Sequence, residues 1–261
     1  MGESAGAVSV DALITSLPDP LPFHAAILQS VQNTLRLSPT SSWNALINVT
    51  NLLLSGPDGD TTWAKTPRQD HLNSTAEKSR IARVSILIES NADEGQTFIA
   101  LDDTGALLGT ALGGSNPKLL QALQDAYPLG TLGLKTESDR IVGEENAAVG
   151  IDSWRYYYNA SFSNLPGSGA YNSAELSAAF GTYPQKGATK LQRELSQGIQ
   201  KACADFAKNP SSGPGWEPVP RLAIFGPNLK AGGDNVTKGV FQVGDPKNLD
   251  LKCKLYQGLY S

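Results

Sequence analysis

Apolar residues are grouped along this chain in short runs that are separated by polar, turn-forming segments. Four runs have the length and the β-branched or aromatic content of strands: 25–30 (AAILQS), 84–90 (VSILIES), 154–162 (WRYYYNASF) and 222–225 (LAIF). The run 84–90 is apolar on both faces except at its ends, which is typical of a strand in a parallel sheet covered by helices. The pattern therefore predicts a parallel sheet.

Two other stretches have the spacing of helices. The segment 7–16 (AVSVDALITS) predicts a short helix, and the segment 188–208 predicts an amphipathic helix that ends at Asn209-Pro210. The apolar positions of the longer helix are Leu191, Leu195, Ile199, Ala202 and Phe206. Strands that alternate with helices indicate an α/β architecture. The segments 51–75 and 103–150 are rich in turn residues, and the pattern assigns no element to them.

The composition excludes several classes of protein. The chain has 261 residues, with 21 basic and 25 acidic side chains, which is ordinary for a globular domain and unlike collagen, a coiled coil or a disulfide scaffold. No run of basic residues could neutralise phosphates, so we expect no nucleic-acid partner. No apolar run approaches the ~18 residues of a membrane-spanning helix. Two histidines and two cysteines do not suggest a zinc site, and we expect no metal and no cofactor.

The first residues contain a motif with a chemical meaning. Gly2-Glu3-Ser4-Ala5-Gly6 has the form G-x-S-x-G, which seats a nucleophilic serine on a tight turn between a strand and a helix. We expect glycine at both ends of the motif because side chains there would clash in the turn. The helix predicted over 7–16 follows directly. A strand before the motif is not expected, since Met1 alone precedes Gly2.

Five blocks then occur in a fixed order: GESAGAVSVDAL, FHAAILQS, RIARVSILIESNADEGQTF, GAYNSAELSAAFGTYP and DFAKNPSSGPGWEP. They resemble successive blocks of the type-B carboxylesterases, in the cholinesterase-like branch of the α/β-hydrolases, and fungal members most of all. The resemblance implies that residues 1–261 are a partial carboxylesterase domain: the C-terminal part of an α/β-hydrolase fold, with an incomplete parallel-type sheet flanked by helices and the N-terminal half absent.

The resemblance also implies which residues occupy the catalytic positions. Ser4 is at the nucleophile position, and Glu94, in the turn Asp93-Glu94-Gly95, is at the position of the triad acid. The family has its catalytic histidine in a block like G-A-Y-H-S-A-E-L, but this chain has Asn172 there. A carboxamide has no nitrogen that accepts a proton near neutral pH. Asp93 is expected to be a solvated turn residue.

Neither histidine of the chain is expected to replace the missing base. His24 lies at the approach to a strand, and His71 lies in a polar loop (RQDHLNST), so each is expected to be a packing or solvated residue. The oxyanion position falls on the backbone N–H of Ala5, but the glycine-rich loop that completes such a site lies upstream of the nucleophile in the family. This chain begins at the motif, so we expect that loop to be missing.

The resulting expectation is a member of the serine carboxylic ester hydrolases, whose substrate would be a small carboxylic ester cleaved through an acyl-enzyme, but which is inactive as written. Two alternatives stay open: a non-catalytic, cholinesterase-like binding protein, or an incomplete gene model of an active secreted esterase. The resemblance implies an extracellular location, although the N-terminus has no signal peptide. Candidate N-glycosylation sites are Asn48, Asn73, Asn159 and Asn235. Cys203 and Cys253 could pair or remain free thiols.

Overall fold

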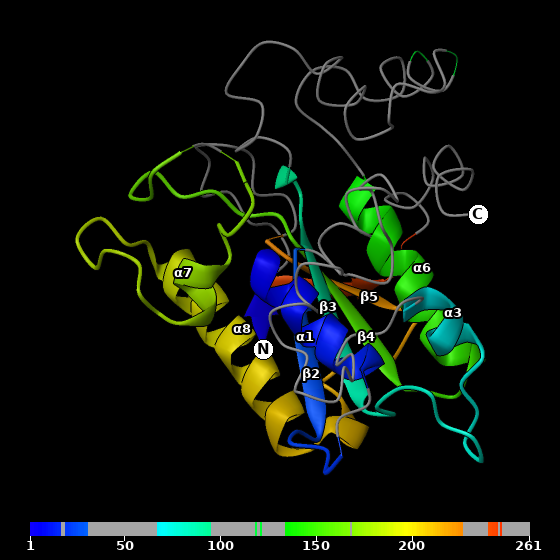
Figure 1. Ribbon diagram of the computed structural model, residues 1–261. Coiled ribbons are helices and arrows are strands. Elements are labelled where there is room, and N and C mark those ends of the chain that lie inside the picture. Colours follow the sequence, from blue (N-terminus) through cyan, green and yellow to red (C-terminus); the bar gives the residue numbers. More distant parts are fainter. Residues whose placement is uncertain are drawn as a thin grey trace, which may run out of the picture.

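The computed structural model describes residues 1–16, 19–30, 67–94, 134–167, 169–226 and 240–244, with single positions at 118, 121 and 246. The centre of this part is a six-stranded sheet with the strands in chain order (Figure 1). The strands are β1 (Gly2–Glu3), β2 (Ala25–Gln29), β3 (Ser85–Asn91), β4 (Ser153–Tyr158), β5 (Leu222–Phe225) and β6 (Phe241–Gly244). The first five are parallel and β6 is antiparallel to β5. The predicted α/β fold with a mostly parallel sheet is confirmed.

Helices flank the sheet. They are α1 (Ala5–Thr15), α3 (Pro67–Leu72), α6 (Leu134–Ala148), α7 (Leu176–Ala179) and α8 (Lys190–Lys208), with a short 3-10 turn η2 (Pro210–Ser212). Helix α8 packs on the face of β4 that carries Trp154, whose ring meets Phe206 edge to face at 5.7 Å. Helix α6 approaches Arg155 through Gly143. Neighbouring strand residues point to opposite faces, so α8 and α6 cover opposite sides of β4.

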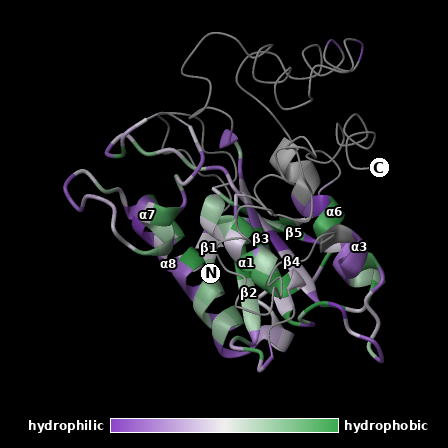
Figure 2. Cartoon of the chain, in the orientation of Figure 1, coloured by the Kyte–Doolittle hydropathy of each residue, from purple (hydrophilic) through white to green (hydrophobic). Residues whose placement is uncertain are grey.

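The hydrophobic pattern explains this core. In β4 every residue is buried, and Trp154, Tyr156 and Tyr158 join the apolar positions of α8 in one cluster. Figure 2 shows hydrophobic colours on α1 and β2, whereas α8 carries both hydrophobic and hydrophilic positions, as an amphipathic surface helix should. Thr189 caps α8 by accepting a hydrogen bond from the N–H of Gln192 (3.1 Å), and the helix ends at Lys208, where the Asn209-Pro210 signal predicted.

Several boundaries differ from those predicted. The first helix begins at Ala5, two residues before the predicted start, and the aromatic strand ends at Tyr158 rather than at 162. That strand stops early because its partner β5 ends at Phe225, whose carbonyl accepts the N–H of Asn159 (2.8 Å). A strand leading into the turn at Ser4 was not expected, but the first two residues of the motif itself, Gly2 and Glu3, form β1, in parallel register with Leu28 and Gln29.

Elements also occur in segments to which the pattern assigned none. Helix α6 lies in the segment 103–150 and buries Ile141 and Val142. Helix α3 lies in the segment 51–75 and contains His71, which is 3% exposed. The prediction that His71 lies in a polar loop is therefore wrong. The residues next to His71, at 70 and 72–73, are polar or exposed. The hydrophobic pattern of this segment therefore did not indicate that one face of a helix is buried.

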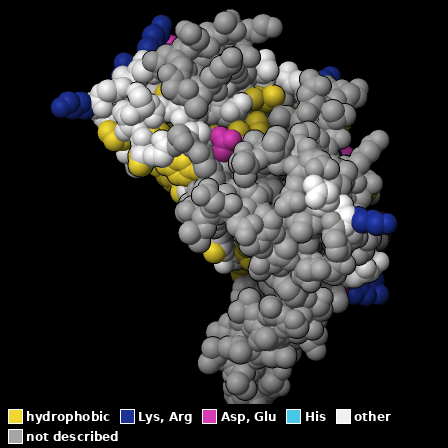
Figure 3. All heavy atoms as spheres, turned by 90° about the horizontal axis from the view of Figure 1, so that it is seen from above, with side chains coloured by type: hydrophobic (Ala, Val, Ile, Leu, Met, Phe, Trp, Pro, Cys, Tyr) yellow, Lys and Arg dark blue, Asp and Glu magenta, His cyan; other side chains and the backbone are white. Residues whose placement is uncertain are grey.

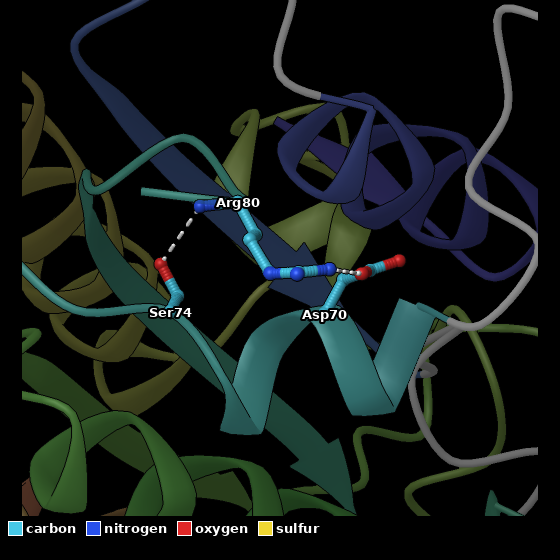
Figure 4. A network of polar contacts seen from close by, with 3 residues as sticks. All are labelled: Asp70, Ser74 and Arg80. Atoms are coloured by element: carbon cyan, nitrogen blue, oxygen red, sulfur yellow. Dashed lines mark hydrogen bonds and ion pairs between the residues drawn. The ribbon is translucent and has the colours of Figure 1, made fainter. Parts of the chain in front are cut away.

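The turn that follows α3 is fixed by polar contacts (Figure 4). Arg80 Nη1 lies 3.2 Å from Asp70 Oδ1, and the backbone N–H of Arg80 donates to Ser74 Oγ (3.2 Å). Ser79 Oγ donates to the carbonyl of Ile81 (2.5 Å), just before β3. These contacts connect the end of α3 to the start of the central strand.

Burial of His71 gives a prediction about pH. Desolvation, with a smaller contribution from the charge of Arg83, lowers the pKa of His71 from 6.5 to about 4, although a hydrogen bond with Asn146 opposes the shift. The unfolded chain therefore binds this proton more readily than the folded chain. The contribution to stability is complete above pH 6.5 and is lost as the pH falls towards 4.

We expect the free energy of unfolding to show this loss as a difference between the wild type and His71→Gln. Between pH 7 and pH 4 the wild type should lose about 3 kcal/mol more than the variant, measured by urea unfolding at each pH. The control is His24→Gln, which replaces an exposed histidine at the start of β2 and should leave the curve parallel to that of the wild type. Parallel curves for His71→Gln would contradict the prediction.

Candidate active site

The turn between β1 and α1 holds Ser4 in an unusual conformation. Ser4 has φ 51° and ψ −120°, a region that residues other than glycine rarely adopt. Its N–H donates to the carbonyl of Gln29 (2.9 Å) at the end of β2, and its carbonyl accepts from Ala7 (3.0 Å) and Val8 (3.1 Å) in the first turn of α1. The strand on one side and the helix on the other therefore hold the strained residue in place.

The two glycines of the motif differ in their surroundings. A Cβ on Gly2 would lie 2.2 Å from the carbonyl oxygen of Gly6, so only glycine fits at the first position. A Cβ on Gly6 would meet no heavy atom of the described residues within 4 Å. The expectation that both positions exclude a side chain is therefore wrong for Gly6. The carbonyl group of Gly6 lies close to the Cα of Gly2, whereas the position of a Cβ on Gly6 points away from this contact.

Glu94 is positioned by the turn that follows β3. Its side chain is 3% exposed, and its Oε1 accepts the backbone N–H of Asn91 (2.9 Å), the last residue of β3. The preceding residue, Asp93, is not a solvated turn residue as expected. Its Oδ2 accepts a hydrogen bond from the N–H of Ala170, and its own N–H donates to the carbonyl of Ala170, each at 2.8 Å. Asp93 thus joins this turn to the loop that carries Asn172.

Asn172 is buried beside Glu94. It is 7% exposed, and its Nδ2 donates to Glu94 Oε2 at 2.9 Å. The next residue, Ser173, has φ 75°, and its hydroxyl contacts Glu3 Oε1 (2.5 Å) and Asn172 Oδ1 (3.3 Å). Glu3 immediately precedes Ser4. The structure therefore brings the Asn172 loop against both the Glu94 turn and the Ser4 turn.

This arrangement defines what the side chains can do. The amide of Asn172 gives Glu94 the same kind of N–H donor that an imidazole would give a triad acid. The remaining polar atom of that amide, Oδ1, does not become protonated near neutral pH. Among the described residues, the side chain that donates to Glu94 from this loop is thus an amide, which cannot act as a general base.

The other predicted residues are placed as follows. Ala5 is the first residue of α1, where a backbone N–H has no partner within the helix. His24 is exposed at the amino end of β2, with its Nε2 2.9 Å from the carbonyl oxygen of Ala207, whereas Ser4 contacts the opposite end of that strand. His71 is buried on α3. Among the described residues, no group of three or more His, Cys, Asp or Glu side chains could hold a metal ion.

Four residues near this site were not predicted from the sequence: Glu3, Asn91, Ser173 and Glu175. Glu3 and Ser173 link β1 to the Asn172 loop, across 170 positions of the chain. Asn91 and Glu175 are hydrogen-bonded behind Glu94. All four lie inside the quoted blocks, next to a candidate residue or within three positions of one. Their closeness in sequence to the candidate residues was therefore the only feature that could have identified them.

The candidate glycosylation sites differ in accessibility. Asn73 is exposed at the end of α3, whereas Asn159 is half-buried and its N–H is bonded to Phe225. Asn48 and Asn235 lie outside the described residues, as does Cys253. Cys203 lies on α8, and burial raises the pKa of its thiol to about 11. Such a thiol is less reactive than an ordinary one.

The surface seen from above the view of Figure 1 shows hydrophobic side chains with an acidic group near the middle, and Lys and Arg side chains towards the periphery (Figure 3). On that face the described basic side chains do not gather into one patch. Among the described helices, none has the length and apolar content to cross a bilayer.

Comparison with known proteins identifies relatives in part of the chain. Secreted lipase 5 of Gibberella zeae is 30% identical over 167 residues, which are 61% of this chain and 30% of the lipase. A chlorogenic acid esterase of Aspergillus niger is 36% identical over 69 residues, 24% of this chain and 14% of the esterase. The matched segments thus span less than a third of either relative. No protein-family model matches the chain.

Solved structures give the fold. A PNB esterase superposes with a TM-score of 0.56 at 20% identity, over 100% of this chain and 62% of the esterase. A second PNB esterase structure gives a TM-score of 0.54 at 19% identity, over 97% of this chain and again 62% of the esterase. The chain therefore has the α/β-hydrolase fold of these esterases, and the resemblance to type-B carboxylesterases indicated by its sequence blocks is confirmed.

Proposed function

We propose that the chain carries the nucleophile, acid and base positions of a serine carboxylic ester hydrolase, and that Asn172 at the base position leaves it able to bind small carboxylic esters without hydrolysing them at an enzymatic rate. The observation that carries this proposal is the hydrogen bond from Asn172 Nδ2 to Glu94 Oε2 (2.9 Å). It supports the proposal because the residue that contacts the proposed acid is an amide, whereas an acyl-enzyme mechanism needs a proton acceptor at the base position.

The step that fails is the first one. Ser4 Oγ attacks the ester carbonyl only if its proton is taken as the new C–O bond forms, and the same group must later return that proton to the leaving alcohol. Asn172 can do neither. The parts that bind the ester are affected less, because the strained turn at Ser4 and the N–H of Ala5 are positioned by β1 and α1.

The relatives support the class of substrate and the location. One is named a secreted lipase and the other a chlorogenic acid esterase, and both names refer to proteins that act on carboxylic esters. We therefore assign a small carboxylic ester as the ligand and an extracellular location to this chain. Asn73, which is exposed, is the described position best suited to carry an N-linked glycan.

Binding and turnover can be measured separately on the full chain. Phenyl butyrate serves as the ligand in saturation-transfer NMR, and p-nitrophenyl butyrate serves as the substrate in a spectrophotometric assay. We expect phenyl butyrate to bind to the wild type and to Ser4→Ala, and we expect both to hydrolyse p-nitrophenyl butyrate at the same background rate. Hydrolysis that disappears in Ser4→Ala would contradict the lack of turnover, and failure of phenyl butyrate to bind would contradict the ligand class.

A further inference from the structure

A buried polar cluster lies behind the contact between Glu94 and Asn172. The side-chain amide of Asn91 donates from Nδ2 to Glu175 Oε2 (2.6 Å) and to Ser30 Oγ (3.1 Å). Glu175 and Ser30 are fully buried and Asn91 is 2% exposed. A buried carboxyl is costly unless its oxygens are satisfied, yet Glu175 Oε1 has no hydrogen-bond partner among the described residues.

These contacts close into a ring. The backbone N–H of Asn91 holds Glu94 Oε1, and the amide of Asn172 holds Glu94 Oε2. Glu175 follows Asn172 by three residues in the same loop, and it holds the side chain of Asn91. We call Glu94, Asn91, Glu175 and Asn172 the acid–amide ring. Glu175 is thus connected to Glu94 through Asn91 on one side and through the Asn172 loop on the other.

Glu175 is surrounded by groups that disfavour a second negative charge. Burial, with smaller contributions from the charges of Glu94 and Glu3, raises the pKa of Glu175 to about 7, against the hydrogen bond from Asn91. The other titratable groups that interact with it are acids: Tyr158, Tyr156 and Cys203, with Glu89 beside the two tyrosines. The pKa of Glu175 therefore lies close to neutral pH.

We propose that Glu175 and Asn91 are positioning residues for Glu94, and that gain or loss of the proton on Glu175 changes the hydrogen bond between Glu94 and Asn172. An ionised Glu175 accepts a charge-assisted hydrogen bond from Asn91 and adds a second charge near Glu94, whereas a neutral Glu175 is a weaker acceptor and removes that repulsion. The ring passes this difference to Asn172. The inference takes its acid and base positions from the proposed function.

The side-chain amide signals in ¹H–¹⁵N NMR spectra of the full chain test this coupling, with the Asn172 signal assigned by its loss in Asn172→Ala. In the wild type we expect the amides of Asn91 and Asn172 to shift together, with a midpoint near pH 7. In Glu175→Gln, which keeps the shape and removes the ionisation, both signals should stay constant between pH 6 and pH 8.

Ser30→Ala is the matched control. It removes the neutral acceptor of the same Asn91 amide and leaves Glu175 in place, so the titration should remain. His24 is present in all these variants and cannot produce the difference between them. An Asn172 amide that does not titrate in the wild type, or that titrates equally in Glu175→Gln, would overturn the proposal. The measurement needs neither bound ester nor a reactive Ser4, so its failure is distinguishable from failure of the proposed function.

Discussion

Replacing Asn172 with histidine should raise the rate at which Ser4 is labelled by a fluorophosphonate ester by about a hundredfold or more, the usual contribution of a positioned general base. An imidazole at this position can donate its Nδ1–H to Glu94 Oε2, as the amide of Asn172 does now at 2.9 Å. Its other nitrogen would then face the side of the loop that Asn172 Oδ1 occupies, next to Ser173 and the contact to Glu3.

Covalent labelling is the appropriate readout because it reports activation of Ser4 before any later step of an ester hydrolysis. It is followed by intact-mass spectrometry on the full chain. Three controls separate a rebuilt triad from other effects. Asn172→His with Ser4→Ala should not be labelled, Asn172→Gln should label like the wild type because it supplies no base, and Asn172→His with Glu94→Gln should lose most of the gain. Equal labelling of Asn172→His and Asn172→Gln would show that position 172 does not serve Ser4.

Asn172 also satisfies the carboxyl to which the proposed function gives the role of the triad acid. Glu94 is 3% exposed, and a buried carboxylate without donors would destabilise the folded chain. The amide of Asn172 supplies a donor to Oε2, so the carboxyl of Glu94 is satisfied without an imidazole. An alanine at 172 would instead remove this donor to Glu94. Under the proposed function, an asparagine at 172 keeps the structural part of a histidine's role, the donor to Glu94, without its chemical part.

The sequence allowed the framework of the site to be predicted, for reasons that are local. The strand at 84–90 and the turn after it are encoded by a buried apolar run followed by polar residues, and the helix after Ser4 follows its motif directly. These features need no knowledge of distant contacts. The same holds for α8, whose apolar spacing and Asn209-Pro210 signal gave both its face and its end.

What could not be predicted depends on pairs that are far apart in the chain. A strand of two residues has no recognisable sequence pattern. Strand β1 forms because Gly2 and Glu3 pair with the end of β2. The contact of Glu3 with Ser173 and that of Asn91 with Glu175 join positions 170 and 84 residues apart. No local pattern distinguishes these carboxylates from solvated ones. Helix α6 was missed because several of its buried positions are polar residues or glycine, namely Asp139, Gly143 and Asn146.

The turn at Ser4 gives the second large prediction, which compares two glycines of one motif. Gly2→Ala should lower the free energy of unfolding by about 3 kcal/mol, because the new Cβ would lie 2.2 Å from the oxygen and 2.4 Å from the carbon of the Gly6 carbonyl, which is backbone and cannot rotate away. Gly6→Ala places its Cβ in open space within a helix, so it should be neutral or up to about 1 kcal/mol stabilising. Urea unfolding of the two variants measures the difference.

The chain has one way to avoid the clash, and it leads to a second measurable loss. Because β1 has only two residues at the edge of the described sheet, it could separate from β2 and carry Gly2 away from Gly6, at a smaller cost in stability. The hydrogen bond from Ser4 N–H to the carbonyl of Gln29 would then break, and Ser4 would lose its strained conformation. In the Asn172→His background, Gly2→Ala should therefore abolish the labelling of Ser4 whether or not the chain unfolds, whereas Gly6→Ala should retain it. Retained stability together with retained labelling in Gly2→Ala would show that the two glycines are equivalent and that the turn at Ser4 does not depend on their close approach.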